Sequence, residues 1–299
     1  MFIITHRGFF FWLTGLILAA AIGAIMFFGL PLGIDFTGGS LMQVDYPNGR
    51  PALTDIQKQT ELVPVGTVSV RAFGENGISI RTRTMNPAEH EAMFAAISGN
   101  TNTTELAYTS VGPALGSQFA NKAMWAIFAV ILVIVLYIAF AFRHVSQPVP
   151  SWGYGITVVA MLVIDIIVPI GFYAAYARFT GAEVDSLFIV ALLALLGYVV
   201  NDIIVIFDRI REHLNRNEKE GIRESFEDTI GKSINETMTR SINTSLTVVL
   251  ALLALIYFGA EATRNFALVM LVGVVAGTFS SITRSAPLLI PIANWFAKR

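Results

Sequence analysis

Six long apolar runs constrain this chain more than any other feature of its sequence. They cover roughly Gly8–Leu30, Ala123–Phe142, Gly153–Tyr176, Leu187–Phe207, Ser241–Phe258 and Phe266–Thr283. Each is close to the ~20 residues that an α-helix needs to cross the hydrocarbon core of a membrane. Only 14% of the 299 residues are charged, against roughly 25% in soluble domains. The sequence therefore predicts an α-helical polytopic membrane protein with six transmembrane helices.

The first apolar run could be mistaken for a cleaved signal peptide. His6 and Arg7 precede it, and the three alanines from Ala19 to Ala21 resemble a cleavage site. A signal peptide has an apolar core of about 7–15 residues, whereas this run continues to Phe28 and beyond. We therefore expect residues 8–30 to be a retained first transmembrane helix.

Lysine and arginine residues predict the orientation of these helices. Arg7, Arg143, the run from Arg209 to Lys232 and the pair Lys298-Arg299 fall on one side, whereas the opposite short loops hold only Arg178 and Arg264. By the positive-inside rule, both termini are expected in the cytoplasm, together with a loop at about residues 208–236. This loop mixes both signs of charge, which predicts a solvated helical hairpin. The net charge of −1 gives no reason to expect a nucleic acid as partner.

Between the first two predicted helices lies a segment, residues 34–118, with the pattern of a folded α+β domain on the outer side. Four strands are expected at Leu41–Tyr46, Val68–Phe73, Ile78–Arg83 and Glu105–Val111, and two helices beginning at Thr54 and at Pro87. We expect Thr54 to cap the first of these helices and Asn86 the second. The order β-α-β-β-α-β is that of the ferredoxin-like motif. Residues 123–299 then hold transmembrane helices 2–6.

Two carboxylates lie inside predicted membrane helices. Asp165 is in the middle of the third run, and Asp202 is the only charge in the fourth. An acid near a helix centre costs about 2.5–3.5 kcal/mol on insertion, so each is expected to face a partner or water. Asp202 lies roughly 8 Å from the inner end of its helix, a depth that Arg240, at the inner start of the fifth helix, can reach.

We therefore expect Asp202 to pair with Arg240 and Asp165, which lies deeper, to be satisfied separately. The alternative for Asp202 is a structural ion pair that holds two helices in register. For Asp165 a hydrogen bond to a neighbouring helix is an equal alternative to a functional role.

Small residues at four-residue spacing predict close helix packing. They are Gly15, Ala19 and Gly23 on the first helix and Gly273, Gly277 and Ser281 on the last. The chain has no cysteine, its four histidines lie outside the apolar runs, and it contains no Walker A sequence. We therefore expect no metal site, no cofactor and no enzymatic activity.

Five stretches resemble the successive signatures of a known family. They are "GIDFTGG" (Gly33–Gly39), "VGPALG" (Val111–Gly116), "GYVVNDIIVIFDRIRE" (Gly197–Glu212), "TRSINTSLT" (Thr239–Thr247) and "YFGAEATRNFAL" (Tyr257–Leu268). They occur in the right order along nearly the whole chain. On these motifs the chain resembles the SecF family, the smaller subunit of the bacterial SecD–SecF protein-export complex.

The resemblance implies a fold related to the resistance-nodulation-division transporters, in which two six-helix halves form a pseudo-symmetric unit. A SecD-like subunit would supply the second half. It also implies a protein of the bacterial inner membrane that uses proton flow to pull or release preproteins on the outer side, after SecA and SecY have threaded them. SecE, SecG, YajC and membrane lipids are the further partners implied. The family's proton-path acid falls on Asp202, in the Asn201-Asp202 step, and its essential arginine on Arg240.

The signature after the first helix consists of Gly33, Asp35, Phe36, Thr37, Gly38 and Gly39. The two adjacent glycines permit backbone angles that other residues resist, and Asp35 and Thr37 can hydrogen-bond the local backbone. Two interpretations fit these residues equally. The segment is either a hinge that passes helix movement to the outer domain or a rigid cap at the helix exit.

Two other functions stay open. A stand-alone exporter of small molecules or lipids would need a second copy of the chain to supply the missing half. A structural assembly factor of the translocation machinery would conduct no ion. If ions are carried, a carboxylate beside Asn201 could serve either H⁺ or Na⁺.

Overall fold

The computed structural model describes residues 2–99, 102–141 and 149–297. The chain forms two compact units. The helical unit comprises Met1–Leu30, Ala126–Thr180 and Leu187–Arg299, and the sheet unit comprises Pro31–Trp125 and Gly181–Ser186.

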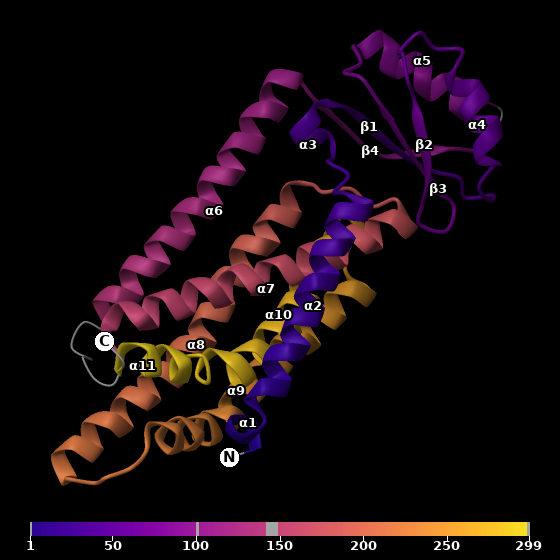
Figure 1. Ribbon diagram of the computed structural model, residues 1–299. Coiled ribbons are helices and arrows are strands. Elements are labelled where there is room, and N and C mark those ends of the chain that lie inside the picture. Colours follow the sequence, from indigo (N-terminus) through magenta and orange to yellow (C-terminus); the bar gives the residue numbers. More distant parts are fainter. Residues whose placement is uncertain (1, 100–101, 142–148, 298–299) are drawn as a thin grey trace. The chain divides into compact units, whose positions relative to one another are not determined.

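Within the described residues, six helical segments are long and apolar enough to cross a membrane (Figure 1). They are α2 (Arg7–Phe28), α6 (Pro113–Ala141), α7 (Ser151–Thr180), α8 (Ser186–Glu220), α9 (Phe226–Phe258) and a sixth that joins α10 (Glu261–Ser280), the π-helical turn η1 (Ser281–Ser285) and α11 (Leu289–Ala297). A short α1 (Phe2–Thr5) comes before α2. The prediction of six long apolar helices is confirmed, and the chain is a multi-pass membrane protein.

Two glycines bring α10 close to α8. A Cβ atom at Gly273 would lie 2.3 Å from Leu195 Cδ2, and one at Gly277 would lie 2.4 Å from Val199 Cγ2. A side chain at either position would require Leu195 or Val199 to move, because apolar helices in a membrane associate by such close packing.

Helix α2 packs closely on α7. The contact runs through Ala21, whose Cα would lie 2.5 Å from a Cβ atom at Gly171 of α7. Gly15 and Gly23 have no neighbouring atom within 4 Å of the Cβ position. Gly15 and Gly23 therefore do not make the contact with α7, since the four-residue spacing does not tell which face of α2 meets that helix.

The charged part of the chain between the fourth and fifth spans is helical almost throughout. Helix α8 runs to Glu220, and α9 begins at Phe226 after Ser225, whose hydroxyl accepts a hydrogen bond from the Asp228 N–H. Arg209 of α8 lies 2.5 Å from carboxylate oxygens of both Glu212 and Glu236. Arg143, Lys298 and Arg299, on which part of the predicted orientation rests, lie outside the described residues.

The sheet unit contains one antiparallel sheet with the strand order β2-β3-β1-β4. Its elements in chain order are α3 (Ile34–Thr37), β1 (Gly39–Asp45), α4 (Leu53–Thr60), β2 (Ser69–Phe73), β3 (Gly77–Thr82), α5 (Pro87–Ser98) and β4 (Thr104–Val111). Alternate residues of β1 and β3 face one another, as Met42 does Ile80, and pack with Ile56 of α4 and Met93 of α5. Helices α4 and α5 therefore cover one face of the sheet (Figure 1).

The ends of α5 and α4 show how far local sequence patterns predict a helix start. Asn86 accepts a hydrogen bond from the Glu89 N–H (2.8 Å), and the Glu89 carboxylate accepts one from the Asn86 N–H (3.0 Å). This reciprocal cap confirms the prediction for α5. Helix α4, however, begins at Leu53 after Ala52 without a side-chain cap, so the prediction for Thr54 was wrong.

Candidate functional site

Asp202 is a buried acid in the helical unit. It lies on α8, and only 6% of the residue is exposed. The hydroxyl of Ser281, the first residue of η1, donates a hydrogen bond to Asp202 Oδ2 at 3.0 Å. A neutral hydroxyl satisfies one oxygen atom but does not balance a negative charge, so an ionised Asp202 needs a further partner.

The predicted pair between Asp202 and Arg240 is not formed in this structure. Arg240 is exposed on α9, whereas the neighbouring Ser241 and Ser245 are buried. Successive residues of an α-helix point about 100° apart. The buried face of α9 carries these serines, and Arg240 therefore points away from that face, toward the surface of the chain. Equal depth in the membrane did not place the two charges on facing sides of their helices. The side chain of Asn201 is also exposed.

A different arginine, Arg284 of η1, lies beside the second acid. Its Nη2 atom is 3.9 Å from Asp165 Oδ1, and the two side chains are only 4% and 2% exposed. Its Nη1 atom donates a hydrogen bond to Thr14 Oγ1 of α2 at 2.9 Å. Arg284 was not predicted from the sequence, because it lies just past Thr283, where the last apolar run ends. The polar residues of "SSITRS", within an otherwise apolar stretch, were the sequence feature that could have indicated a buried polar site.

The π-helical turn η1 contacts both acids. Ser281 at its start bonds to Asp202, and Arg284 near its end approaches Asp165. The turn ends two residues before Pro287. Proline has no N–H to donate to the carbonyl four residues earlier and its ring crowds that carbonyl. A widened turn before Pro287 is therefore expected, and such turns are frequent at functional sites.

Several polar atoms around Asp165 are buried without a partner. Among the described residues, neither carboxylate oxygen of Asp165 nor Nε of Arg284 takes part in a hydrogen bond. The Ser280 side chain faces this carboxylate, but its hydroxyl donates to Met161 Sδ at 3.8 Å. Pro169, inside α7, has no N–H for the backbone carbonyl of Asp165 four residues earlier. The site therefore brings the Asp165 carboxylate and the Arg284 guanidinium together without a hydrogen bond between them.

The glycine signature after α2 is tightly packed within the sheet unit. Gly38 and Gly39 have φ values of +75° and +126°, in the region that favours glycine. A Cβ atom at Gly38 would lie 2.8 Å from Pro113 Cα, and one at Gly39 would lie 2.6 Å from Thr82 O. The Thr37 hydroxyl donates to the carbonyl oxygens of Gly33 (3.0 Å) and Gly38 (3.2 Å).

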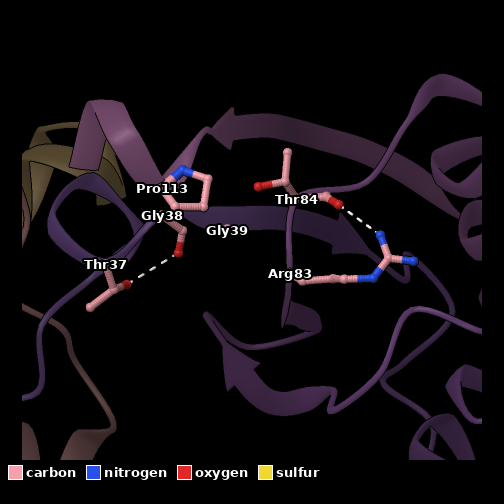
Figure 2. A pocket seen from close by; sticks show the side chains of 6 residues that line it. All are labelled: Thr37, Gly38, Gly39, Arg83, Thr84 and Pro113. Carbon is pink, nitrogen blue, oxygen red and sulfur yellow. Dashed lines mark hydrogen bonds between the residues drawn. The ribbon is translucent and has the colours of Figure 1, made fainter. Parts of the chain in front are cut away.

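These residues also border a small surface pocket. It has a volume of about 380 Å³ and is lined by Thr37, Gly38, Gly39, Arg83, Thr84 and Pro113 (Figure 2). The Arg83 guanidinium donates to the Thr84 carbonyl at 2.8 Å (Figure 2) and pairs with Glu89 at 2.6 Å. The cation of this pocket is therefore already neutralised by a residue of the same unit.

Asp35 and the loop between α7 and α8 form a second cluster in the sheet unit. Asp35 Oδ2 accepts a hydrogen bond from the N–H of Ser186, the first residue of α8, at 2.8 Å. We expected a bond to the local backbone, and the partner is instead 151 residues away. Val184 bonds through its N–H to Pro31 O and through its carbonyl to the Gly33 N–H, each at 2.8 Å.

Glu183 of the same loop joins two strands of the sheet unit. Its Oε1 lies 3.1 Å from Arg71 Nη1 of β2, and its Oε2 lies 2.9 Å from Arg81 Nη1 of β3. Arg71 also donates to Gly181 O at 2.7 Å, and Arg81 donates to Thr37 Oγ1 at 2.6 Å. We call this set of residues, Glu183 with Arg71 and Arg81, the arginine clamp. The described residues contain no group of three or more His, Asp or Glu that could hold a metal ion.

The chain is similar to proteins of one family over nearly its whole length. The family model "Protein export membrane protein SecD/SecF, C-terminal" matches residues 90–295, and the model "SecD/SecF GG Motif" matches residues 23–46. The protein translocase subunit SecF of Thermobaculum terrenum is 36% identical, with 98% of this chain and 94% of the relative covered. SecF of Anaerolinea thermophila is 33% identical, with 99% and 97% covered.

Solved structures show the same similarity in three dimensions. The crystal structure of SecDF from Thermus thermophilus matches with a TM-score of 0.83 and 27% identity. A SecDF structure in a "super-membrane-facing form" matches with a TM-score of 0.66. Both matches cover 99% of this chain, but the chain spans only 38% and 39% of those longer chains.

Proposed function

We propose a function from the premise that this chain belongs to the SecD/SecF family of protein export membrane proteins. It acts as a SecF-type subunit of protein translocation, driven by an ion gradient. It lies in the bacterial inner membrane, with both termini in the cytoplasm and the sheet unit on the outer side. Preproteins threaded by SecA through the channel of SecY, SecE and SecG, with YajC nearby, are then pulled or released on that side. We propose no enzymatic role.

A SecD-like subunit completes the assembly. The similar SecDF structure is a single longer chain of which this protein spans 38%. Six membrane helices are one half of the pseudo-symmetric transporter that the family implies, so the other half comes from a partner. The exposed position of Arg240 on α9 is consistent with a side chain that faces this partner.

The observation that carries this function is the burial of Asp202 with one neutral hydroxyl as its partner. A buried acid without a balancing charge among the described residues is either protonated or paired with a group that is present only in part of the cycle. We propose that Asp202 gains and loses a proton in each cycle and that Arg240 and Asn201 act on it in the assembled complex.

One proton that crosses the membrane supplies about 2.3 kcal/mol per 100 mV. This free energy is enough to bias a movement between two conformations, but it does not unfold a stable substrate in one step. Export would therefore proceed by many small movements or by a ratchet.

The sheet unit carries the mechanical part of this proposal. Its element order and strand order fit a ferredoxin-like domain. The Cβ positions of Gly33, Gly38 and Gly39 would each fall within 2.8 Å of a backbone atom. This close packing favours a rigid connection after α2 over a hinge, so we propose that helix movement is passed on without bending in this segment.

The test is completion of export by a preprotein already trapped in the channel. Vesicles carry this chain with its SecD-like partner, ATP is removed, and an H⁺ or a Na⁺ gradient is imposed. We expect completion to require a gradient and to be lost in Asp202→Asn. The matched control is Asp208→Asn on the same helix, because Asp208 is exposed and pairs with Arg211 at 2.8 Å.

The outcomes separate the candidate functions. Loss in Asp202→Asn alone supports ion-driven export, and the effective gradient names the ion. Gradient-dependent export that Asp202→Asn leaves intact contradicts a role of Asp202. If no gradient affects export, the chain is a structural assembly factor. Transport of small molecules or lipids by vesicles that lack the partner supports a stand-alone exporter.

A further inference from the structure

We propose that Asp165 is a second proton-carrying residue of this chain and that Arg284 is the cation that controls its charge. The inference rests on the proposed function, because it adds a site to the same ion pathway. Loading forms one O–H bond at the Asp165 carboxylate with a proton taken from water. Release breaks that bond and returns the proton to water, with no oxidation or reduction.

The geometry of the pair differs from that of a closed ion pair. The nearest charged atoms, Arg284 Nη2 and Asp165 Oδ1, are 3.9 Å apart, and neither carboxylate oxygen has a hydrogen bond within the described residues. A buried carboxylate is stable in its charged form only with good pairing geometry and additional hydrogen bonds. The observed arrangement therefore fits an Asp165 that holds a proton.

Arg284 has an alternative partner in this conformation. Its Nη1 atom donates to Thr14 Oγ1 at 2.9 Å, and the Thr14 hydroxyl donates in turn to Phe10 O at 2.7 Å. The guanidinium carbon also lies 5.8 Å from the centre of the Phe279 ring. When Asp165 loses its proton, the new negative charge attracts the guanidinium, which then moves from Thr14 to the carboxylate. Arg284 thus has two partners, one for each charge state of Asp165.

The groups around Asp165 leave Arg284 as the charge that controls it. Arg284 of η1 and Ser280 at the end of α10 lie near the carboxylate. Thr14 of α2 accepts a hydrogen bond from the Arg284 guanidinium. The other buried acid, Asp202 of α8, is engaged by the Ser281 hydroxyl. Only the guanidinium among these groups carries a positive charge.

The turn η1 couples the two acids. Ser281 and Arg284 belong to one π-helical turn of five residues, so a movement of Arg284 toward Asp165 strains the bond from Ser281 to Asp202. A widened turn can change to α-helical pairing by a shift of one residue, which rotates the side chains on either side of it relative to one another. Proton loss at Asp165 would thereby change the surroundings of Asp202 without any group from a partner subunit.

The test is infrared titration of carboxyl groups in vesicles that hold this chain with its SecD-like partner. The C=O stretch of a protonated carboxyl group is followed between about pH 4 and 9, where a buried carboxyl group titrates. We expect a band that disappears in Asp165→Asn and persists in Asp202→Asn. Each variant is first checked for assembly with the partner by size-exclusion chromatography.

Three further variants test whether Arg284 controls the charge of Asp165. Arg284→Met removes the cation and should move the midpoint of the Asp165 band to higher pH by at least about one unit, which is tenfold in proton affinity. Arg284→Lys, which keeps the charge, should shift it less. Thr14→Val removes the competing partner of Arg284 and should move the midpoint to lower pH. These variants keep Asp165 and test the inference even if Asp165→Asn fails to assemble.

The absence of a titrating band that depends on Asp165 overturns the inference. A band that neither Arg284→Met nor Thr14→Val shifts also overturns it, because Arg284 would then not control the charge. If gradient-driven export is lost in Asp202→Asn and no titrating band depends on Asp165, this inference is refuted but the proposed function is not. Export without gradient dependence refutes the proposed function, whatever the band does.

Discussion

Two arginine–carboxylate groups in this protein use the same chemistry with different geometry. In the arginine clamp of the sheet unit, each oxygen of Glu183 contacts a different guanidinium, at 3.1 and 2.9 Å. In the helical unit, Asp165 and Arg284 approach only to 3.9 Å, and both carboxylate oxygens lack hydrogen bonds among the described residues. The first group is fully engaged, and the second is not.

Burial makes this difference meaningful. The Glu183 side chain is 19% exposed and Arg71 is 42% exposed, whereas Asp165 and Arg284 are almost completely buried. Water can compensate an imperfect contact at the surface, but a buried charge requires complete pairing. An engaged, partly exposed group therefore holds parts in place, whereas a buried and unsatisfied one can change its charge state.

The largest effect is expected from a substitution that displaces the backbone around the arginine clamp. Gly38→Ala places a Cβ atom 2.8 Å from Pro113 Cα at a φ of +75°. Backbone strain of about 1–3 kcal/mol and overpacking of about 1–3 kcal/mol should add. The measurement is the free energy of unfolding of the sheet unit in detergent.

The control is Gly66→Ala, which has a similar φ of +80° but no atom within 4 Å of the Cβ position. It should show the strain alone. Equal losses for the two variants would show that the packing at Gly38 does not hold the segment in place.

The second prediction asks whether the two groups differ in function. Asp165→Asn should reduce gradient-driven export by ~5- to 150-fold, which corresponds to a typical coupling free energy of about 1–3 kcal/mol. Glu183→Gln should have a much smaller effect, because the clamp holds the loop but exchanges no proton. Export rates of trapped preprotein in vesicles measure both, and similar losses would remove the functional distinction.

The third prediction concerns the strength of the clamp. Glu183→Gln keeps the shape but removes the charge, and should weaken the attachment of the loop by about 1 kcal/mol, since partly exposed pairs contribute little. Hydrogen exchange at the Val184 N–H, which bonds to Pro31 O at 2.8 Å, should become faster. Glu75→Gln, at an exposed position of the same unit, should leave this exchange rate unchanged. An unchanged rate in Glu183→Gln would show that backbone bonds alone hold the loop.

The sequence predicted what depends on local pattern or on solvation. The six spans followed from the length of apolar runs, and the cap of α5 followed from Asn86-Pro87. Asp165 and Asp202 stood out because the cost of a buried acid can be judged from its neighbours in sequence. Each of these features is decided within about one helix length.

The remaining parts depend on which faces of the helices meet. Depth placed Arg240 level with Asp202, but the angular position of Arg240 on α9 depends on packing that the sequence does not reveal. Arg284 reaches Asp165 through a π-helical turn, and Glu183 reaches two strands of a sheet more than 100 residues away along the chain. These contacts depend on tertiary structure and could not be predicted from spacing.

The smallest effect is expected at a third ion pair, between Arg83 and Glu89, whose side chains are 51% and 21% exposed. The hydrogen bond from Arg83, supported by the Asn86 backbone, lowers the pKa of Glu89 to about 2 from an ordinary value of 4.5. A carboxyl group with a lowered pKa stabilises the fold above its unfolded value and loses this contribution as the pH falls from about 4.5 to about 2. The stability of the sheet unit should therefore decline slightly in this window, and Glu89→Gln should remove this part of the decline. A pH profile of the unfolding midpoint measures it. If wild type and Glu89→Gln have the same profile, the pairing of Arg83 with Glu89 contributes nothing to the stability of the sheet unit.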